Sequence, residues 1–141
     1  MYERIGRRGE AARDKLMEAG RAGESLCAFL LEKHFGLEVH HVRTTEDDLW
    51  CRNDNGTVIR VQVKSANLRG RNRYEYYTGT RRGADVYAFV ALGDDLMLLK
   101  PSDFVGDKSR ININKKKFTL HNMITSGNEV LAQYNLPELP G

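Results

Sequence analysis

Asp48, Gln62 and Lys64 are residues whose types and spacing could bind a metal ion and a phosphate group. On a β-strand, side chains two residues apart share a face, so Gln62 and Lys64 would point one way and Val61 and Val63 the other, into apolar packing. Mg²⁺ prefers oxygen ligands, which an Asp48 carboxylate and a Gln62 amide would supply. The Lys64 ammonium could hold an attacking water or stabilise charge in a transition state. These residue types therefore predict a site for phosphate chemistry.

Two strands joined by a tight turn would bring these residues together. Asp48–Arg52 and Thr57–Ser65 are predicted strands, and the Asn53–Gly56 segment between them ends in Asn-Gly, a strong signal for a hairpin turn. The hairpin places its strands side by side, so Asp48 converges with Gln62 and Lys64 if it faces the same side of the sheet.

A helix is predicted over Glu24–Phe35, because apolar residues recur at helical spacing around most of its circumference and Gly36 is a natural C-terminal stop. Gly20 and Gly23 interrupt the chain just before this pattern begins. Glu24, in the first turn of the helix, could add a second carboxylate that binds a metal ion or a water.

Each of these residues also has a purely structural explanation. An acid in the first turn of a helix, such as Glu24, is stabilised by the helix macrodipole. Asp48 could simply begin a strand, with the adjacent Asp47 as the functional acid, and Lys64 could end one. A Gln/Glu-x-Lys triplet is also expected by chance about once in a chain of this size. The four residues together, in this order and on these elements, are much less expected by chance.

The rest of the pattern favours an α+β fold with a mostly antiparallel central sheet flanked by helices. Ala84–Leu92 is the most apolar stretch and is predicted as a central strand, whereas residues 66–83 read as a basic loop containing glycines and three tyrosines. The other expected elements are strands at Leu37–Val42 and Leu96–Lys100, a helical turn at Pro101–Phe104, an edge strand at Arg110–Asn114, and a helix or tail from Thr125 to Gly141.

The composition fits one domain spanning residues 1–141, with a charged N-terminal arm (1–20) and a C-terminal tail (125–141). No apolar run approaches the length of a membrane span, and the charged N-terminus does not resemble a signal peptide, so we expect a cytoplasmic protein. Cys27 and Cys51 lack C-x-x-C spacing and are expected to be reduced thiols in the core, which leaves a structural zinc site without support.

Basic residues cluster although the net charge is only +3. One cluster lies in the 66–83 segment, and a second comprises Lys108, Arg110 and Lys115–Lys117. Clustered cations suit a polyanionic partner, although a solvated face explains a charge run equally well.

Several segments resemble the PD-(D/E)XK nuclease superfamily. Gly20–Ser25 is similar to its G-x-x-G-E helix start, Asp48–Trp50 to its Asp-containing strand, Val61–Ser65 to its [EQ]-x-K strand and Ala84–Val90 to the apolar strand that follows. The resemblance covers about residues 20–105. The Glu-Asp-Gln-Lys set is closest to the group I intron homing endonucleases built on this restriction-endonuclease-like core, and archaeal-type Holliday junction resolvases share the order.

The resemblance implies hydrolysis of phosphodiester bonds in DNA with Mg²⁺, for which Mn²⁺ could substitute. Asp48 and Gln62 would ligate the metal with the Val63 carbonyl as a further ligand, Lys64 would orient water, and Glu24 would contact a second metal or an ordered water. The chain has no Pro before the acid, and Gln replaces the more common Glu. The loss of one negative charge predicts weaker Mg²⁺ affinity than in a site with three carboxylates.

The basic segment would then act as a DNA clamp. Arginines and lysines would contact phosphates, and Tyr74, Tyr76 and Tyr77 could stack on bases or hydrogen-bond phosphates, although at least one of these tyrosines is expected to pack on the core. The predicted DNA contacts are Arg69, Arg71, Arg73, Tyr76, Arg81, Arg82, Lys115 and Lys116.

Four functions remain compatible with these patterns: a homing-type or phage-type endonuclease, which we favour, a Holliday junction resolvase, a catalytically silent DNA-binding module, and a structural protein. Because one small domain buries little DNA surface and cutting both strands needs two active sites, we expect a homodimer or homotetramer. Its interface would involve the arm 1–20 and the tail 125–141.

Overall fold

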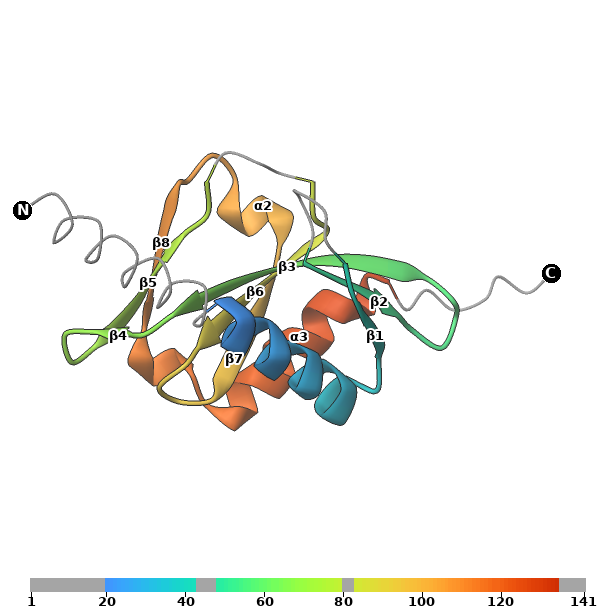
Figure 1. Ribbon diagram of the computed structural model, residues 1–141, viewed down its shortest axis with the longest axis horizontal. Helices are drawn as coiled ribbons and strands as arrows, with labels where there is room; N and C mark the ends of the chain where they lie inside the picture. Colours follow the sequence, from blue (N-terminus) through green and yellow to red (C-terminus); the bar gives the residue numbers. More distant parts are fainter. Residues whose placement is uncertain (1–19, 43–47, 80–82, 135–141) are drawn as a thin grey trace, which may run out of the picture.

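The computed structural model describes residues 20–42, 48–79 and 83–134, which form two sheets and their flanking helices (Figure 1). A helix covers residues 20–35. The elements that follow it are β1 (Glu38–His41), β2 (Leu49–Arg52), β3 (Val58–Ala66), β4 (Leu68–Arg69), β5 (Arg73–Tyr77), β6 (Val86–Ala91), β7 (Leu96–Pro101), α2 (Ser102–Val105), β8 (Arg110–Asn114), the 3₁₀ helix η1 (Lys115–Lys117) and α3 (Leu120–Ala132).

The central sheet has five strands in the order β1-β2-β3-β6-β7. All neighbours are antiparallel except β3 and β6, which pair in parallel. The predicted hairpin between β2 and β3 is confirmed, because Gly56 N–H donates to the Asn53 carbonyl at 3.0 Å and the Asn53 side chain accepts from Thr57 N–H at 2.9 Å. The predicted α+β fold with a mostly antiparallel sheet is therefore confirmed.

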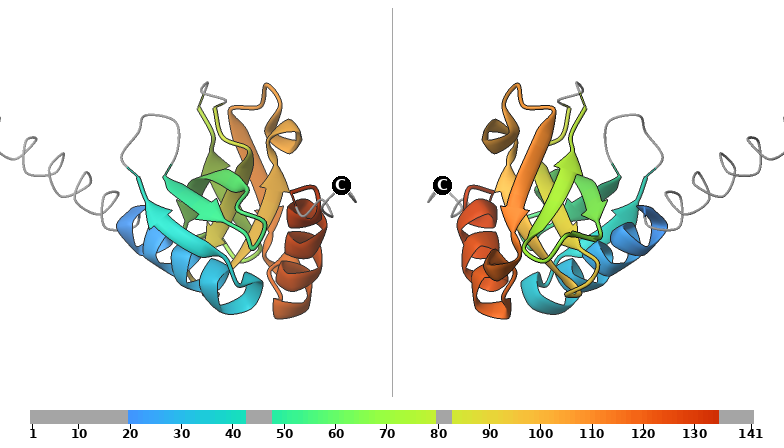
Figure 2. Two further views of the ribbon diagram at one scale, coloured as in Figure 1. Left: turned by 90° about the vertical axis from the view of Figure 1, so that its right-hand side faces the viewer. Right: turned by 90° about the vertical axis from the view of Figure 1, so that its left-hand side faces the viewer.

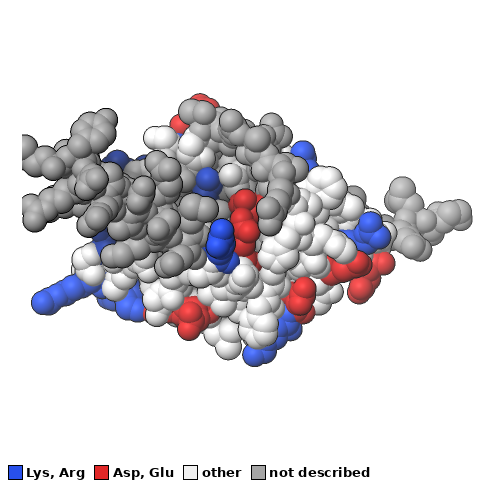
Figure 3. Space-filling view, viewed as in Figure 1, with Lys and Arg blue, Asp and Glu red and all other residues white. Residues whose placement is uncertain are grey.

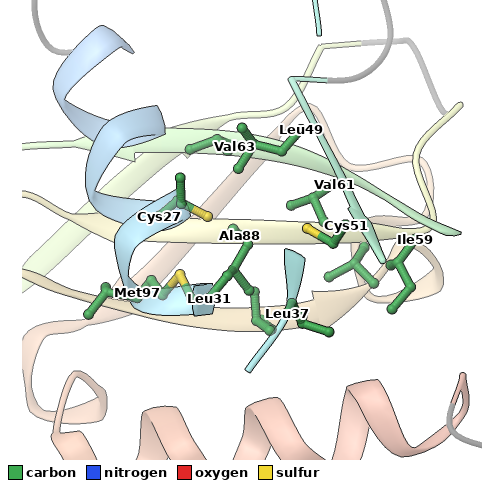
Figure 4. Close-up of a cluster of buried hydrophobic side chains, with 14 of the residues drawn as sticks. Cys27, Leu31, Leu37, Leu49, Cys51, Ile59, Val61, Val63, Ala88 and Met97 are labelled. Atoms are coloured by element: carbon green, nitrogen blue, oxygen red, sulfur yellow. The ribbon is translucent and has the colours of Figure 1, made fainter. Parts of the chain in front are cut away.

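One face of the central sheet carries the main core. Cys27 and Leu31 of the helix over residues 20–35 pack against Val61 and Val63 of β3 and Ala88 of β6 (Figure 4). α3 contributes to the same core, and the two helices converge below the strands in both views of Figure 2. The alternation of buried and half-buried residues along β3 puts Gln62 and Lys64 on the opposite face, as predicted.

The opposite face is covered by a second sheet, of order β4-β5-β8, and by α2. The prediction of a loop over residues 66–83 is wrong for the part that forms β4 and β5. Tyr74 and Tyr76 of β5 are buried against Tyr87 and Phe89 of β6, and the charged residues between and beside them face outward. The period of two was present in the sequence, but the arginines and glycines around it favoured a loop.

The predicted boundaries of the first and last helices need correction. Gly20 and Gly23 are helical, so they do not interrupt the chain before Glu24. α3 begins at Leu120, where the Thr119 side chain accepts a hydrogen bond from Asn122 N–H at 3.0 Å. Residues 125–132 are thus part of a helix that packs on the core, and Gly127 is its contact with Phe35.

Both cysteines are buried and free, which confirms the prediction of core thiols. Burial raises the pKa of the Cys27 thiol well above its usual value, and burial raises the pKa of Cys51 to about 12. No helix in the described parts of the chain is long and apolar enough to cross a membrane.

These thiols predict a loss of stability in alkali. The folded state retains both thiol protons at pH values where the unfolded chain releases them. The contribution of the thiols to the free energy of unfolding is therefore constant below the usual pKa of 9.0 and falls as the pH rises toward 12. The expected slope is about 1.4 kcal/mol per pH unit for each thiol. Urea unfolding with reductant between pH 7 and 11 measures it. Cys51→Ala should unfold with a shallower slope, and an unchanged slope in that variant would contradict the prediction.

Candidate active site and nucleic-acid interface

Asp48 immediately precedes β2 and is hydrogen-bonded across to β3. Leu49 lies opposite Val61, so the same register continued by one residue brings Asp48 opposite Gln62. Asp48 N–H donates to the Val61 carbonyl at 3.0 Å, and the Asp48 Oδ2 accepts from Val63 N–H at 2.8 Å. The carboxylate therefore lies at the edge of β3 that β2 leaves uncovered, next to the predicted metal ligands.

Gln62 and Lys64 are half-buried on the face of β3 that is turned toward the second sheet. Their parallel partners on β6 are Tyr87 and Phe89, which are both fully buried. Lys64 thus belongs to a strand that has aromatic packing beside it. Because Lys64 is half-buried, its charge is partly shielded from water and interacts more strongly with an anionic group than a fully solvated cation would.

The helix over residues 20–35 reaches this end of β3 through a very close contact. A Cβ added to Gly23 would lie 1.6 Å from Ser65 Oγ and 2.7 Å from Ser65 Cβ, so only glycine fits without movement. Ser65 is the residue after Lys64, and Glu24 is the residue after Gly23. The contact therefore brings the half-buried Glu24 to the same end of the central sheet as Lys64.

The charges of both acids act on the Cys27 thiol. Its thiol pKa is raised first by burial and then by the charges of Cys51, Asp48 and Glu24. Glu24 lies three residues before Cys27 on the same helix, whereas Asp48 precedes β2 in the sheet. The two acids that the sequence singled out therefore act on the same thiol from elements far apart along the chain.

The donor set fits a hard cation with few protein ligands. Within the described residues, no group of three or more His, Cys, Asp or Glu side chains is arranged to hold a metal ion. An Mg²⁺ ion would instead have Asp48 and Glu24 as anionic ligands, with the Gln62 amide as a neutral oxygen. Because the N–H and C=O of one strand residue point to the same side, the Val63 carbonyl also faces the edge beside Asp48. Asp47, the alternative acid, lies outside the described residues.

The structure describes only some of the residues of the predicted basic clamp. Arg69, Arg71 and Arg73 are exposed around the β4–β5 turn, and Figure 3 shows Lys and Arg side chains projecting at this end of the molecule. Arg81 and Arg82 lie outside the described residues. Lys116 is exposed on η1, whereas Lys115 Nζ donates to Asp94 Oδ1 at 2.6 Å and so ties η1 to the β6–β7 turn.

The prediction that Tyr76 contacts DNA is wrong. Its side chain is only 1% exposed, and its hydroxyl donates to the Val90 carbonyl at 3.0 Å. Tyr74 is also buried, with its hydroxyl bonded to Asp94 at 2.7 Å. Both rings are core residues because β5 alternates, and Tyr77 is the tyrosine that the alternation leaves exposed.

Sequence reasoning did not connect Glu75 with Arg69 and Arg110, which the structure brings together. Arg110 Nε lies 2.8 Å from Glu75 Oε1, and Arg69 Nε lies 3.4 Å from Glu75 Oε2, so the carboxylate forms an ion pair with each arginine. The Glu75 side chain is only 7% exposed between them. The sequence did contain one indication of this arrangement. Arg73, Glu75 and Tyr77 are spaced by two residues and would therefore share one face of a strand.

A groove of about 420 Å³ lies on another part of the molecule, between α3, α2 and the β7 and β8 strands. Its lining includes Leu98, Phe104 and Asn112, and none of the four predicted catalytic residues. It therefore does not bear on the candidate active site, which lies at the edge of β3.

The fold has a counterpart among solved structures. The chain is similar to the bacterial homing endonuclease I-Ssp6803I, with a TM-score of 0.59 and 19% sequence identity over 83% of this chain and 94% of that chain. At this level of sequence identity, the structural similarity shows that the two proteins share a fold. No protein-family model matches the sequence, and no curated protein sequence does.

Proposed function

We propose that this protein is a metal-dependent DNA endonuclease whose active site comprises Glu24, Asp48, Gln62 and Lys64. The observation that carries the proposal is the bond from Val63 N–H to the Asp48 carboxylate, beside Gln62 and Lys64 on one face of β3. The shared fold with a homing endonuclease supports it, because that fold presents a nuclease site in at least one other protein. Within this class we favour a homing-type or phage-type enzyme.

Each residue has a role that follows from its chemistry and position. Asp48 and Glu24 supply negative charge for Mg²⁺, and Gln62 and the Val63 carbonyl supply neutral oxygens. Bound Mg²⁺ would act as a Lewis acid toward the scissile phosphate. Lys64 holds its positive charge beside the phosphate, where it orients the attacking water and stabilises the added negative charge of the transition state.

Two active sites are needed to cut both strands of a duplex, so the proposal includes a homodimer or homotetramer. Within the segment 125–141 that we expect at its interface, residues 125–132 belong to α3, whose Val130 and Leu131 are buried in the core, and residues 135–141 lie outside the described residues. The arm 1–20 lies almost wholly outside the described residues.

The proposal is tested by incubating the full chain with supercoiled plasmid, linear duplex, single-stranded DNA and a four-way junction, with Mg²⁺ or with EDTA. We expect cleavage of duplex DNA that requires the metal. Preferential cutting of the junction would select a Holliday junction resolvase instead. DNA binding without cleavage of any substrate would select a silent binding module, and no binding at low salt would refute a nucleic-acid function.

Gln62→Glu should raise the affinity for Mg²⁺, because it adds a third negative charge to the proposed metal site. We expect the Mg²⁺ concentration at half-maximal cleavage to fall by about tenfold, equivalent to about 1.4 kcal/mol. A Mg²⁺ titration of the cleavage rate measures it, and Arg60→Gln, which alters the same strand outside the proposed site, is the control. A half-maximal concentration that stays unchanged in Gln62→Glu would remove Gln62 from the metal site.

A further inference from the structure

The outer face of the second sheet carries polar side chains in strand register. On β5 and β8 the inward residues are aromatic or aliphatic, and the outward residues are charged or amide-bearing, apart from the exposed Tyr77. Cross-strand pairs join Arg73 to Asn114, Glu75 to Asn112 and Tyr77 to Arg110. In the right-hand view of Figure 2, β5 and β8 present this broad face to the viewer.

Glu75 fixes two of the arginines on this face. Its carboxylate bridges Arg69 and Arg110, whose side chains remain 63% and 58% exposed. The Tyr77 hydroxyl donates to Glu75 Oε1 at 3.2 Å, and the Arg110 guanidinium stacks on the Tyr77 ring at 5.2 Å from its centroid. Each guanidinium has five N–H donors, so both retain donors for a ligand while their positions are held. Such pre-organisation reduces the entropy lost on binding.

Arg73 and Asn112 complete the face. Both are exposed, Asn112 where the face borders the groove beside β8, and the described residues contain no hydrogen-bond partner or ion pair for either side chain. Asn114 differs, because its Oδ1 accepts from Lys116 N–H at 2.9 Å and so caps η1. Arg73 and Asn112 are therefore the two residues best placed to contact a partner, and they lie on a diagonal of the sheet, about 7–8 Å apart.

We propose that this face reads base edges in the major groove of duplex DNA, with Arg73 contacting guanine and Asn112 contacting adenine. Arginine pairs with guanine O6 and N7, and asparagine pairs with adenine N6 and N7. A two-stranded β-ribbon fits the major groove, which is about 12 Å wide. Three arginines against one glutamate also give the face the positive charge that attracts phosphates. The diagonal spacing puts the two bases about two base pairs apart.

The inference deepens the proposed function and rests on it for its link to cleavage. β3 carries Lys64 and leads directly into β4, so Lys64 and Arg69 are five residues apart. An extended chain of that length spans at most about 18 Å, or about five base pairs of duplex DNA, and Arg73 lies directly opposite Arg69 in the sheet. The bases that the sheet reads should therefore lie within about one helical turn of the cut.

The test uses a library of random-sequence duplexes and the full chain. In EDTA, duplexes bound by the protein are recovered and sequenced, and in Mg²⁺ the cut ends are sequenced separately. Arg73→Ala and Asn112→Ala are compared with the wild type. Arg71→Ala is the control, because Arg71 is also exposed but lies in the β4–β5 turn, outside this face. Thermal unfolding confirms that each variant folds.

We expect the wild type to enrich a motif containing guanine and adenine, and each variant to lose preference at one of these positions by about tenfold or more. Arg71→Ala should bind all sequences more weakly and keep the motif. A wild type that enriches no motif, or variants that keep it, would overturn the inference. Absence of cleavage in the Mg²⁺ arm would refute the proposed nuclease instead, and the binding arm would still decide the role of the sheet.

Discussion

Replacing Lys64 with alanine should slow Mg²⁺-dependent DNA cleavage by at least about 100-fold, the loss seen when one charge-stabilising group is removed from an active site. The half-buried Lys64 is aligned with Gln62 along β3, and its ammonium is the cation that the proposed chemistry requires at the scissile phosphate. DNA affinity should change little, because most phosphate contacts would come from the exposed arginines near the β4–β5 turn. Single-turnover cleavage and DNA-binding measurements separate these two effects.

Lys33→Ala provides the matched control, since Lys33 is an exposed lysine on the other side of the main core, where it lies over the Phe29 ring. It should cleave at the wild-type rate. Lys64→Arg retains the charge but enlarges and flattens the head group, so it should recover only part of the activity. Undiminished cleavage by Lys64→Ala would exclude Lys64 from the active site and leave the Gln-x-Lys pattern as a coincidence.

The β2–β3 hairpin could be predicted because all the information it needs is local. The Asn-Gly turn sets the register, and the alternation of Val61 and Val63 with Gln62 and Lys64 fixes which face each residue occupies. The shared face of Gln62 and Lys64 was predicted for this reason. The parallel pairing of β3 with β6 was not, because it depends on where a long connection returns to the sheet.

β8 was predicted as an edge strand, but β4 and β5 were missed because they are short and because the inward and outward residues of β5 suggest different structures. β5 reads as Arg-Tyr-Glu-Tyr-Tyr, in which aromatic residues suggested stacking on a ligand and charged residues suggested a loop. Only the burial of Tyr74 and Tyr76 against Phe89 and Phe118 shows that this alternation belongs to a core strand. The Glu75 bridge between Arg69 and Arg110 depends in turn on β4, β5 and β8 meeting in space.

Glu24 illustrates a third case, in which the residue was predicted but the contact that positions it could not be predicted from the sequence. The helix pattern predicted an acid in a first turn, which has an ordinary explanation in the helix macrodipole. What brings Glu24 to the end of β3 is the contact of Gly23 with Ser65, and these two residues are far apart in the sequence. The glycine that the pattern treated as an interruption is the residue that allows the helix to approach the sheet.

Gly23→Ala should therefore both destabilise the protein and impair cleavage. The new Cβ would meet Ser65 Oγ at 1.6 Å and Ser65 Cβ at 2.7 Å, so the helix and β3 must separate. Overpacking of this kind costs about 1–3 kcal/mol, from which the better helix propensity of alanine recovers up to about 1 kcal/mol. Urea unfolding measures the loss. Cleavage should fall further than stability alone explains, because Glu24 moves with the helix.

A second substitution tests whether the effect of Gly23→Ala arises from its contact with Ser65. Ser65→Gly removes both clashing atoms and leaves Ser65 Cα 3.8 Å from the new Cβ, so Gly23→Ala combined with Ser65→Gly should recover stability and cleavage together. Gly20→Ala is the matched control, because nothing lies within 4 Å of its Cβ position and alanine there should be neutral or stabilising. If the double variant is as unstable as the sum of its two single variants, the two residues are not coupled. The helix would then owe its position over β3 to the wider core around Cys27 and Leu31.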